Sequence, residues 1–423
     1  MRSEPRSEIE SLLSIPLSSE DDLFGHSSQD RPRVKTENLI VDGKSVPKYS
    51  REFWTSRQRQ ASRIHEISYR ACFKPQLPRF FIENFSNAGD LIYDPFGGRG
   101  TTAIEAALLR RNIASNDINP LSRILTEPRL SAPDIENVRR RLMDIPLSGE
   151  AKADIDLSMF YHPRTESEIV SMRNYFVTRT RKKSEDDIDK WIRMVATNRL
   201  TGHSPGFFSV YTLPPNQAVT QEKQRKINHQ RNQKPEYRDC RKIILQKTLS
   251  LVSGLTTEQI ASLRAAGANA MFFTADARNV FALDDDSVQL TVTSPPFLDV
   301  VQYSKDNWLR CWFNSIDSDA ISGKLTISKK IAGWTNVMTD VFKDLFRVTK
   351  KGGWVAFEVG EVRKGSVRLE EYIVPLGISA GFKCKGIIIN EQHFTKTSNI
   401  WGVSNNISGT NSNRIVLFEK VKR

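Results

Sequence analysis

The sequence predicts an α/β fold with a mostly parallel sheet and a large helical insertion. Residues 90–119 read as a short apolar strand, a glycine-rich turn, an alanine- and leucine-rich helix and a second strand. Such a strand–turn–helix–strand unit makes its strands parallel and its crossover right-handed. The same alternation resumes after residue 268, with expected strands at 270–278, 287–292, 350–361, 381–390 and 413–421 and expected helices at 336–350 and 370–381.

Shifts in composition divide the chain into three regions. Residues 1–50 are rich in Ser, Asp, Glu, Arg and Lys and show little periodicity, so we expect a mobile N-terminal arm. Residues 51–122 and 268–423 carry the α/β pattern and form the expected main domain. Residues 123–267 interrupt that pattern with helical pieces and a turn-rich stretch, and they form the expected insertion.

Composition also restricts the classes of partner and site. The chain has 62 Lys and Arg against 49 Asp and Glu, a net charge of +13, which favours nucleic acid as a partner over the alternative of a generally basic surface. No run of eighteen apolar residues is present and the first ten residues lack an apolar signal core, so we expect a cytoplasmic protein without a membrane span. The four cysteines form no CxxC pair, and His162, His203 and His229 lack metal-ligand spacing, so we expect no metal site.

Acidic residues follow three strands of the expected sheet. Asp94 begins the glycine-rich turn DPFGGRGTT, Asp117 ends the next strand, and Asp276 lies in FFTADA. The turn lets the main chain approach a ligand closely, but it is neither GxGxxG nor a P-loop with its lysine. Carboxylates at three strand ends suit an ammonium group, ribose hydroxyls and an adenine amino group, which together describe S-adenosyl-L-methionine. The alternative for each acid alone is a turn or a helix cap.

Two stretches of the chain resemble motifs of the DNA amino-methyltransferases. DPFGGRGTT at 94–102 resembles motif I, and TSPPF at 293–297 resembles motif IV. The Ser-Pro-Pro form of motif IV is typical of DNA (cytosine-N4) methyltransferases of restriction–modification systems. Residues 65–85 resemble motif X, which closes over the methionine end of the cofactor. The resemblance covers about residues 60–122 and 268–421.

The resemblance implies a Rossmann-like S-adenosylmethionine-dependent methyltransferase fold for the catalytic domain, with a mostly parallel seven-stranded sheet and an antiparallel C-terminal strand. It implies methylation of the exocyclic N4 amine of cytosine in a specific duplex DNA sequence. The implied partners are double-stranded DNA and a companion restriction endonuclease that acts on the same site. The cofactor-binding residues it implies are Phe73, Lys74, Asp94, Pro95, Phe96, Gly98, Gly100, Thr101, Thr102, Asp117, Ile118, Asp276 and Ala277.

The resemblance of TSPPF to motif IV implies a site for a base that has swung out of the duplex. In the family reading, Ser294 and the carbonyl of Pro295 accept hydrogen bonds from N4, while Pro295 and Pro296 keep these acceptors aimed. Phe297 stacks on a base swung out of the duplex. The lone pair of N4 is delocalised into the ring, so the site must draw the amine hydrogens out of plane before direct attack on the methyl group. No cysteine follows a proline, which argues against methylation at cytosine C5. For TSPPF alone, the alternative is a strand-terminating turn.

The insertion at 123–267 is the natural place for recognition of the target sequence. Its stretch 221–247 holds nine Lys and Arg against three acids and suits contacts to phosphates. The alternative is a solvated helix face beside a packed loop. Side chains that could reach bases are Phe207, Phe208, Tyr211, Asn216 and Gln217.

Three other activities stay open on the sequence. One is methylation of adenine N6 in DNA, for which Asp or Asn at position 294 is commoner. Another is methylation of guanine N2 in RNA, whose enzymes more often carry Asp-Pro-Pro-Tyr and a dedicated RNA-binding domain. The third is a catalytically inactive nucleic-acid-binding protein, which predicts damage to motif I or IV, whereas both motifs are intact.

Overall fold

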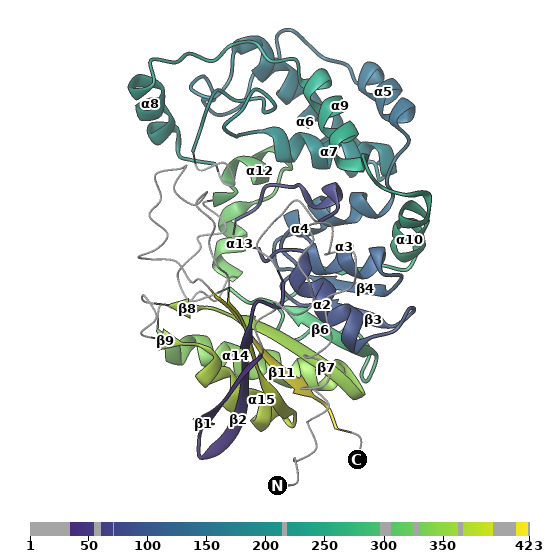
Figure 1. Cartoon of the computed structure of the whole chain (residues 1–423). Coiled ribbons are helices and arrows are strands. Elements are labelled where there is room, and N and C mark those ends of the chain that lie inside the picture. Colours follow the sequence, from purple (N-terminus) through teal and green to yellow (C-terminus); the bar gives the residue numbers. More distant parts are fainter. Residues whose placement is uncertain are drawn as a thin grey trace, which may run out of the picture.

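The protein is built on a mixed sheet whose strands run in the order β1-β2-β10-β11-β7-β6-β3-β4-β5 (Figure 1). The computed structural model describes residues 34–54, 61–70, 72–213, 218–296, 306–324, 330–362, 367–391 and 412–421. The strands are β1 (Lys35–Val41), β2 (Lys44–Arg51), β3 (Leu91–Asp94), β4 (Asn112–Asn116), β5 (Met271–Phe273), β6 (Val288–Thr293), β7 (Thr349–Val359), β10 (Lys383–Glu391) and β11 (Ser412–Glu419). A separate pair joins β8 (Glu361–Val362) to β9 (Val367–Arg368).

The central strands have the topology expected for a methyltransferase. Strands β5, β4, β3, β6 and β7 are parallel to their neighbours, and β11 lies antiparallel between β7 and β10. The chain goes from β3 outward through β4 to β5, and then returns to the other side of β3 as β6. The prediction of a Rossmann-like methyltransferase fold is confirmed. In open α/β sheets, ligands bind at the carboxyl ends of the strands where the order reverses, here between β3 and β6.

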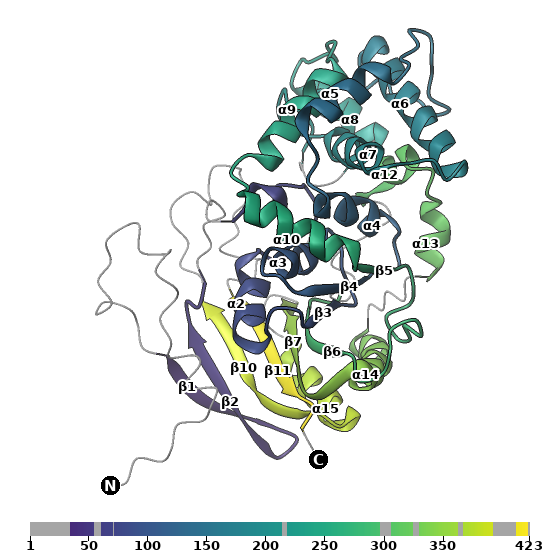
Figure 2. The ribbon, with the colours of Figure 1, turned by 90° about the vertical axis from the view of Figure 1, so that its right-hand side faces the viewer.

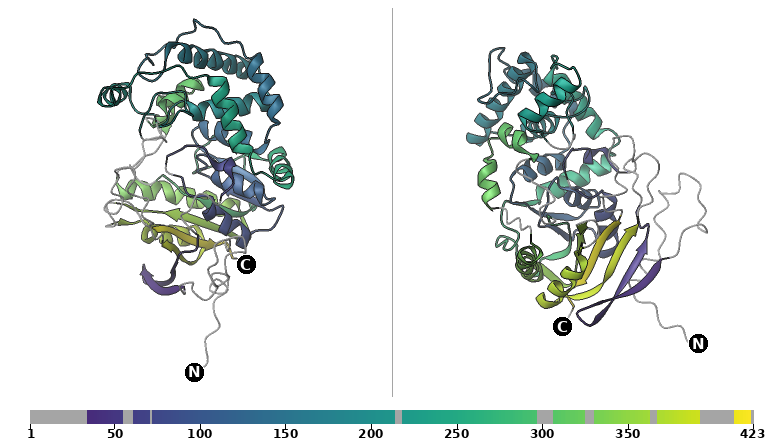
Figure 3. Two further views of the ribbon diagram at one scale, coloured as in Figure 1. Left: turned by 45° about the horizontal axis from the view of Figure 1, so that its top comes forward. Right: turned by 90° about the vertical axis from the view of Figure 1, so that its left-hand side faces the viewer.

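A hairpin at the N-terminus extends this sheet. Strands β1 and β2 are antiparallel around Asp42 and Gly43, which both have positive φ, as a tight two-residue turn requires. Strand β2 then pairs in parallel with β10, so the hairpin lies beside the last strands in the right-hand view of Figure 3. The prediction of a mobile arm over 1–50 is therefore wrong for residues 35–50. Residues 1–33 lie outside the described part of the chain.

Helices cover both faces of the sheet because alternate residues of each strand point to opposite sides. Ile92 belongs to a core shared with α2 (Gln76–Phe85), α3 (Thr101–Leu108) and α10 (Thr257–Ala268). Tyr93 belongs to the core under α14 (Ile331–Val348) and α15 (Glu370–Ala380). Helix α2 begins two residues before Pro78, where the sequence suggested a start just after that proline.

A layer of helices stands at one end of the sheet (Figures 1 and 2). It contains α5 (Ile135–Asp144), α6 (Pro163–Arg181), α7 (Asp187–Arg199), α8 (Gln221–Gln230) and α9 (Cys240–Val252) from the insertion, with α12 (Trp308–Phe313) beside them and α13 (Ser318–Lys324) following. The first and last helices of the insertion, α4 (Leu121–Thr126) and α10, instead flank the sheet. None of the described helices is both long and apolar enough to cross a membrane.

Candidate active site

The glycine-rich turn of motif I holds its shape through main-chain hydrogen bonds. The N–H of Gly97 donates to the carbonyl of Asn116 (2.8 Å), and the N–H of Gly100 donates to that of Gly97 (2.6 Å). Gly98 and Gly100 have φ of +52° and +76°, a region that favours glycine. A Cβ on Gly100 would lie 2.2 Å from the hydroxyl of Thr126. Both the conformation and the close approach therefore require glycine at position 100.

Asp117 is bound to this turn. One of its carboxylate oxygens accepts the N–H of Gly98 (2.8 Å), and the other accepts the N–H of Asn119 (2.9 Å). Burial nevertheless raises the pKa of Asp117 above its usual range. The acid expected to meet ribose hydroxyls thus lies against the turn expected to meet the methionine end of the same ligand.

Asp94 joins motif I to motif IV. Its carboxylate is buried and accepts the hydroxyl of Thr293 (2.7 Å) and the N–H of Phe96 (3.1 Å). The hydroxyl of Thr102 donates to the carbonyl of Val292 (3.1 Å), which forms a second connection. Burial raises the pKa of Asp94 to about 6. These contacts place Asp94 and the start of Ser-Pro-Pro side by side at the reversal point of the sheet.

Ser294 has a partner that the sequence analysis did not identify. The carboxyl of Glu358, on the neighbouring strand β7, lies close enough for the Ser294 hydroxyl to lower its pKa. Glu358 is buried and also accepts the side-chain amide of Asn413 from β11. Burial raises the pKa of Glu358 to about 7, although Asn413 and Ser294 both favour its ionised form. The carboxyl therefore titrates near neutrality beside the predicted base-binding serine.

The proline corner of motif IV is fixed from a helix on one face of the sheet. The indole N–H of Trp334, near the start of α14, donates to the carbonyl of Pro296 (2.9 Å). Pro295 is buried, and Pro296 is half-buried. Phe297, predicted to stack on the base, lies outside the described residues.

Arg99 connects motif I to motif X. Its guanidinium donates to the carbonyls of Ile67 (2.9 Å) and Phe73 (3.5 Å). Phe73 and Lys74 are half-buried, and burial lowers the pKa of Lys74. Burial raises the pKa of the Cys72 thiol. The charge of Arg99 lowers this pKa and the charge of Glu358 raises it, so both groups lie close enough to act on Cys72. Motif X thus borders both the glycine-rich turn of motif I and the Glu358 carboxyl beside Ser294.

Asn116 holds the third strand end in place. Its side chain donates to the carbonyls of Pro95 (3.2 Å) and Ala275 (3.0 Å) and accepts the N–H of Ala275 (3.0 Å). The residues after β3, β4 and β5 are therefore brought together. Asp276 itself forms an ion pair with Arg278 (2.6 Å), which lowers the pKa of Asp276. The carboxylate of Asp276 is thus already paired with Arg278, and an adenine amino group would have to compete with that ion pair.

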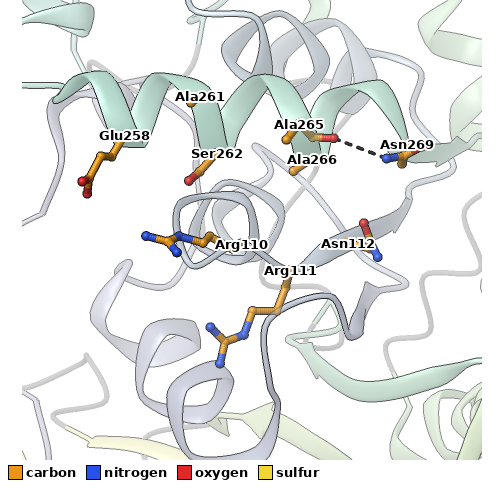
Figure 4. Close-up of a pocket in the computed structure, with 9 residues that line it drawn as sticks. All are labelled: Arg110, Arg111, Asn112, Glu258, Ala261, Ser262, Ala265, Ala266 and Asn269. Atoms are coloured by element: carbon orange, nitrogen blue, oxygen red, sulfur yellow. Dashed lines mark hydrogen bonds between the residues drawn. The ribbon is translucent and has the colours of Figure 1, made fainter.

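The predicted cofactor residues occupy one edge of the sheet, apart from a groove that runs along α10. In the described chain, Ile118 and Ala277 are half-buried beside Asp117 and Asp276, and Thr101 is buried at the start of α3. A groove of about 460 Å³ instead runs along α10, by the turn that leads into β4 (Figure 4). No predicted site residue lines it; it is lined by Arg110, Arg111, Asn112, Glu258, Ala261, Ser262, Ala265, Ala266 and Asn269.

The aromatic side chains in the turn-rich loop of the insertion are packed against the protein rather than exposed to solvent. Phe207 and Phe208 are buried, and Tyr211 is half-buried, so the first two cannot reach bases as the sequence suggested. Asn216 and Gln217 lie outside the described residues. Within the described ranges, no three His, Cys, Asp or Glu side chains are grouped so as to hold a metal ion.

Comparisons with known proteins match parts of the chain to DNA methyltransferases. Residues 18–124 match the family model N6_N4_Mtase, described as DNA methylase. The chain is 33% identical over 91 residues to the type II methyltransferase M.MjaII of Methanocaldococcus jannaschii, covering 21% of this chain and 17% of the relative. It is 36% identical over 114 residues to the type II methyltransferase M.BsoBI of Geobacillus stearothermophilus, covering 25% and 22%. The matches thus span less than a quarter of either relative.

Solved structures are similar only in part. TTHA0409 of Thermus thermophilus, a candidate DNA modification methylase complexed with S-adenosyl-L-methionine, aligns with a TM-score of 0.22 at 23% identity, over 35% of this chain and 54% of that one. The rRNA methyltransferase aviRa of Streptomyces viridochromogenes aligns with a TM-score of 0.35 at 9% identity, over 86% and 92%. The family model and the two type II methyltransferases support a place for this chain in the DNA amino-methyltransferase family.

Proposed function

We propose that the chain is a DNA methyltransferase that transfers a methyl group to the N4 amine of cytosine in a specific duplex sequence. The observation that carries this proposal is the junction of Asp94, Thr293 and Ser294 at the reversal point of the sheet. This junction brings a cofactor motif and a base-binding motif to one edge. The type II methyltransferase relatives support a role in a restriction–modification system. We propose further that a companion endonuclease acts on the same sequence.

The residues present fit S-adenosyl-L-methionine, which supplies a methyl group on a positively charged sulfur when bound. The positive-φ glycines keep side-chain atoms out of the turn, where the methionine part would lie. The half-buried Asp117 offers its carboxylate to ribose hydroxyls, and Asp94 adds a negative charge when ionised. Phe73 and Lys74 border the turn through Arg99. Asp276 is a weaker candidate than the sequence suggested, because Arg278 already occupies its carboxylate.

Glu358 orients the hydroxyl of Ser294 for the base. An ionised Glu358 can only accept a hydrogen bond, so the Ser294 O–H donates to it. The lone pairs of Ser294 then face away and accept an N–H of the target amine, together with the carbonyl of Pro295. These two acceptors draw the amine hydrogens out of the ring plane, which frees the nitrogen lone pair for attack.

Glu358 also provides a destination for a proton. After methyl transfer, the nitrogen carries one hydrogen too many, and that proton passes through the Ser294 hydroxyl to the Glu358 carboxylate. A carboxyl with a pKa of about 7 accepts a proton and releases it again near neutral pH. A serine hydroxyl next to a carboxylate suits an amine substrate, because the pair can accept the proton that the amine loses. Ser at position 294, rather than Asp or Asn, favours cytosine over adenine as the target base.

A transfer assay tests the proposal. Purified protein is incubated with cofactor labelled on the methyl group and with unmethylated genomic duplex DNA, single-stranded DNA or tRNA, and the nucleosides are then separated. We expect label in N4-methylcytosine from duplex DNA. We expect Ser294→Ala to slow transfer about 100-fold or more, the usual loss when one aimed hydrogen-bonding group is removed, while cofactor affinity persists.

Each other outcome of this assay selects an alternative. Label in N6-methyladenine would replace cytosine by adenine as the target. Label in tRNA would select an RNA methyltransferase. Duplex binding without transfer of label would select an inactive nucleic-acid-binding protein. Unchanged turnover of Ser294→Ala would contradict the role of Ser294.

A further inference from the structure

Helix α8, every residue of which is described, is polar on all sides. Gln224 is its one buried residue, and the ten residues QEKQRKINHQ include a single aliphatic side chain, Ile227, which is half-buried. A helix of this kind gains little from apolar burial and is usually held by specific polar contacts or serves a surface role. Its sequence therefore needs an explanation other than the core.

Side-chain amides attach α8 to the packed loop of the insertion. The amide of Gln224 donates to the carbonyl of Tyr211 (3.0 Å) and to Asn228 (2.8 Å), and the amide of Gln233 donates to the same two acceptors (2.9 and 2.8 Å). Asn228 in turn donates to the carbonyl of Met159 (2.7 Å). These bonds use one face of the helix and leave the opposite face to solvent.

The solvent face carries an excess of positive charge. Residues 221–234 contain five Lys and Arg against one Glu, and all five cations are exposed. Lys223, Arg231 and Lys234 have no carboxylate partner among the described residues. Arg231 is instead placed over the ring of Tyr211, 3.8 Å from its centroid.

The cations of α8 differ from two arginines elsewhere in the insertion that pair with a buried acid. Arg141 and Arg179 both pair with the buried Asp189, so those cations serve the interior of the helical layer. In α8 the two acid contacts, Arg225 with Asp156 and Lys226 with Glu222, are surface pairs. Surface pairs of this type contribute little to stability and exchange readily for another anion.

The chain that enters α8 is tied to the segment that follows motif IV. The N–H of Ala218 donates to the carbonyl of Asp306 (3.0 Å), and the indole of Trp308 donates to the carbonyl of Val219 (3.2 Å). The carboxylate of Asp306 accepts the guanidinium of Arg70 from motif X (2.8 Å). A series of hydrogen bonds therefore connects the start of α8 to Asp306, after motif IV, and through it to Arg70 of motif X.

We propose that α8 and residues 231–234 form a face that binds the phosphates of duplex DNA and thereby sets how the duplex lies over the candidate site. The proposal rests on the proposed function and names the element that holds the substrate backbone. Exposed lysines and arginines neutralise phosphates without reading sequence, so this face governs affinity and salt dependence rather than target choice.

The salt dependence of duplex binding tests this face. Full-length protein and the variant Lys223→Gln/Arg231→Gln/Lys234→Gln are titrated against a mixed-sequence duplex between about 50 and 200 mM salt. The logarithm of the binding constant falls as log salt rises, and each phosphate contact adds about 0.9 to the steepness of this fall. Loss of three contacts therefore makes the fall less steep by up to about 2.7. Glutamine keeps the helix propensity, and thermal melting checks the fold.

A matched control removes the same charge elsewhere in the insertion. Arg139→Gln/Arg140→Gln/Lys182→Gln neutralises three exposed cations, two of them on α5, which lies on the side of the helical layer opposite α8 in Figure 1. We expect this control to keep the wild-type slope. We also expect the α8 variant to keep the wild-type affinity for the cofactor.

The outcomes separate this inference from the proposed function. An α8 variant with the slope of wild type and control overturns the inference, even if the protein methylates DNA. Duplex binding with the expected drop in slope but without methyl transfer supports the face and contradicts the proposed activity. A drop in slope seen with RNA but not with duplex DNA contradicts the duplex as occupant.

Discussion

At the scale of single residues, the candidate site is defined by two carboxyls whose pKa is raised by burial. Asp94 titrates near 6 beside Thr293, and Glu358 titrates near 7 beside Ser294. Both lie at the carboxyl edge of the parallel strands, on either side of β6. Perturbed groups gathered around one crevice are typical of catalytic sites. In the mechanism proposed above, Ser294 contacts the base, and Glu358 is the positioning residue behind it.

The role of Glu358 predicts a pH dependence of turnover. Its carboxyl is ionised above its pKa, so the form that orients Ser294 and accepts the proton increases as the pH rises through about 7. We expect kcat to rise over the same range and then level off. Glu358→Gln should lower kcat by about 10- to 1,000-fold, remove this rise, and leave cofactor affinity unchanged. Stopped assays from about pH 5.5 to 9 measure the profile.

The comparison of variants separates positioning from folding. Glu358→Asp keeps an ionisable group and should retain a titration with lowered turnover. If Glu358→Gln kept the wild-type rise in kcat with pH, some other group would be responsible for it.

At the scale of elements, the hairpin β1–β2 shows how a polar segment becomes part of the sheet. Asn390, at the end of β10, is fully buried, and its side-chain oxygen accepts the N–H of Phe53 (2.7 Å) and of Trp54 (3.1 Å). Its amide donates back to the carbonyl of Trp54 (3.2 Å). One side chain therefore binds the chain that leaves β2 to the sheet.

Removal of this side chain should destabilise the protein. Asn390→Ala leaves two buried N–H groups and one carbonyl without partners, and we expect a loss of roughly 2–4 kcal/mol in the free energy of unfolding. Denaturant titration measures this change. Asn390→Asp keeps the acceptor for both N–H groups and should lose less. Equal stability of Asn390→Ala and wild type would show that the hairpin is not anchored in this way.

The sequence predicted those elements whose patterns are strong. The strands β6, β7, β10 and β11 are runs of apolar residues and were found where expected. The hairpin was missed because its strands are half polar, although Asp42-Gly43 is a recognised turn signal. Glu358 was missed because a single acid in an apolar strand has no motif; its role depends on the register between β6 and β7. The engagement of Asp276 by Arg278 is a side-chain contact that no strand pattern reveals.

At the scale of the whole molecule, three segments distant in sequence meet around the candidate site. Arg70 from motif X, Asp306 after motif IV and Ala218 from the insertion are joined by two hydrogen bonds. The insertion is thus attached to the catalytic edge as well as to the helices that flank the sheet. In the proposed function, this attachment lets a helical layer bound to the duplex hold the target base over the Ser294 corner.

The central claim is that this corner methylates cytosine N4 in duplex DNA, and the genome of a cell that expresses the chain tests it most directly. The genomic DNA is sequenced by a method that reports N4-methylcytosine, alongside DNA from cells that express Ser294→Ala at the same level. We predict N4-methylcytosine within one recurring sequence, and its loss in the variant. Methyl groups confined to adenine, or an unmodified genome in the presence of folded protein, would contradict the account.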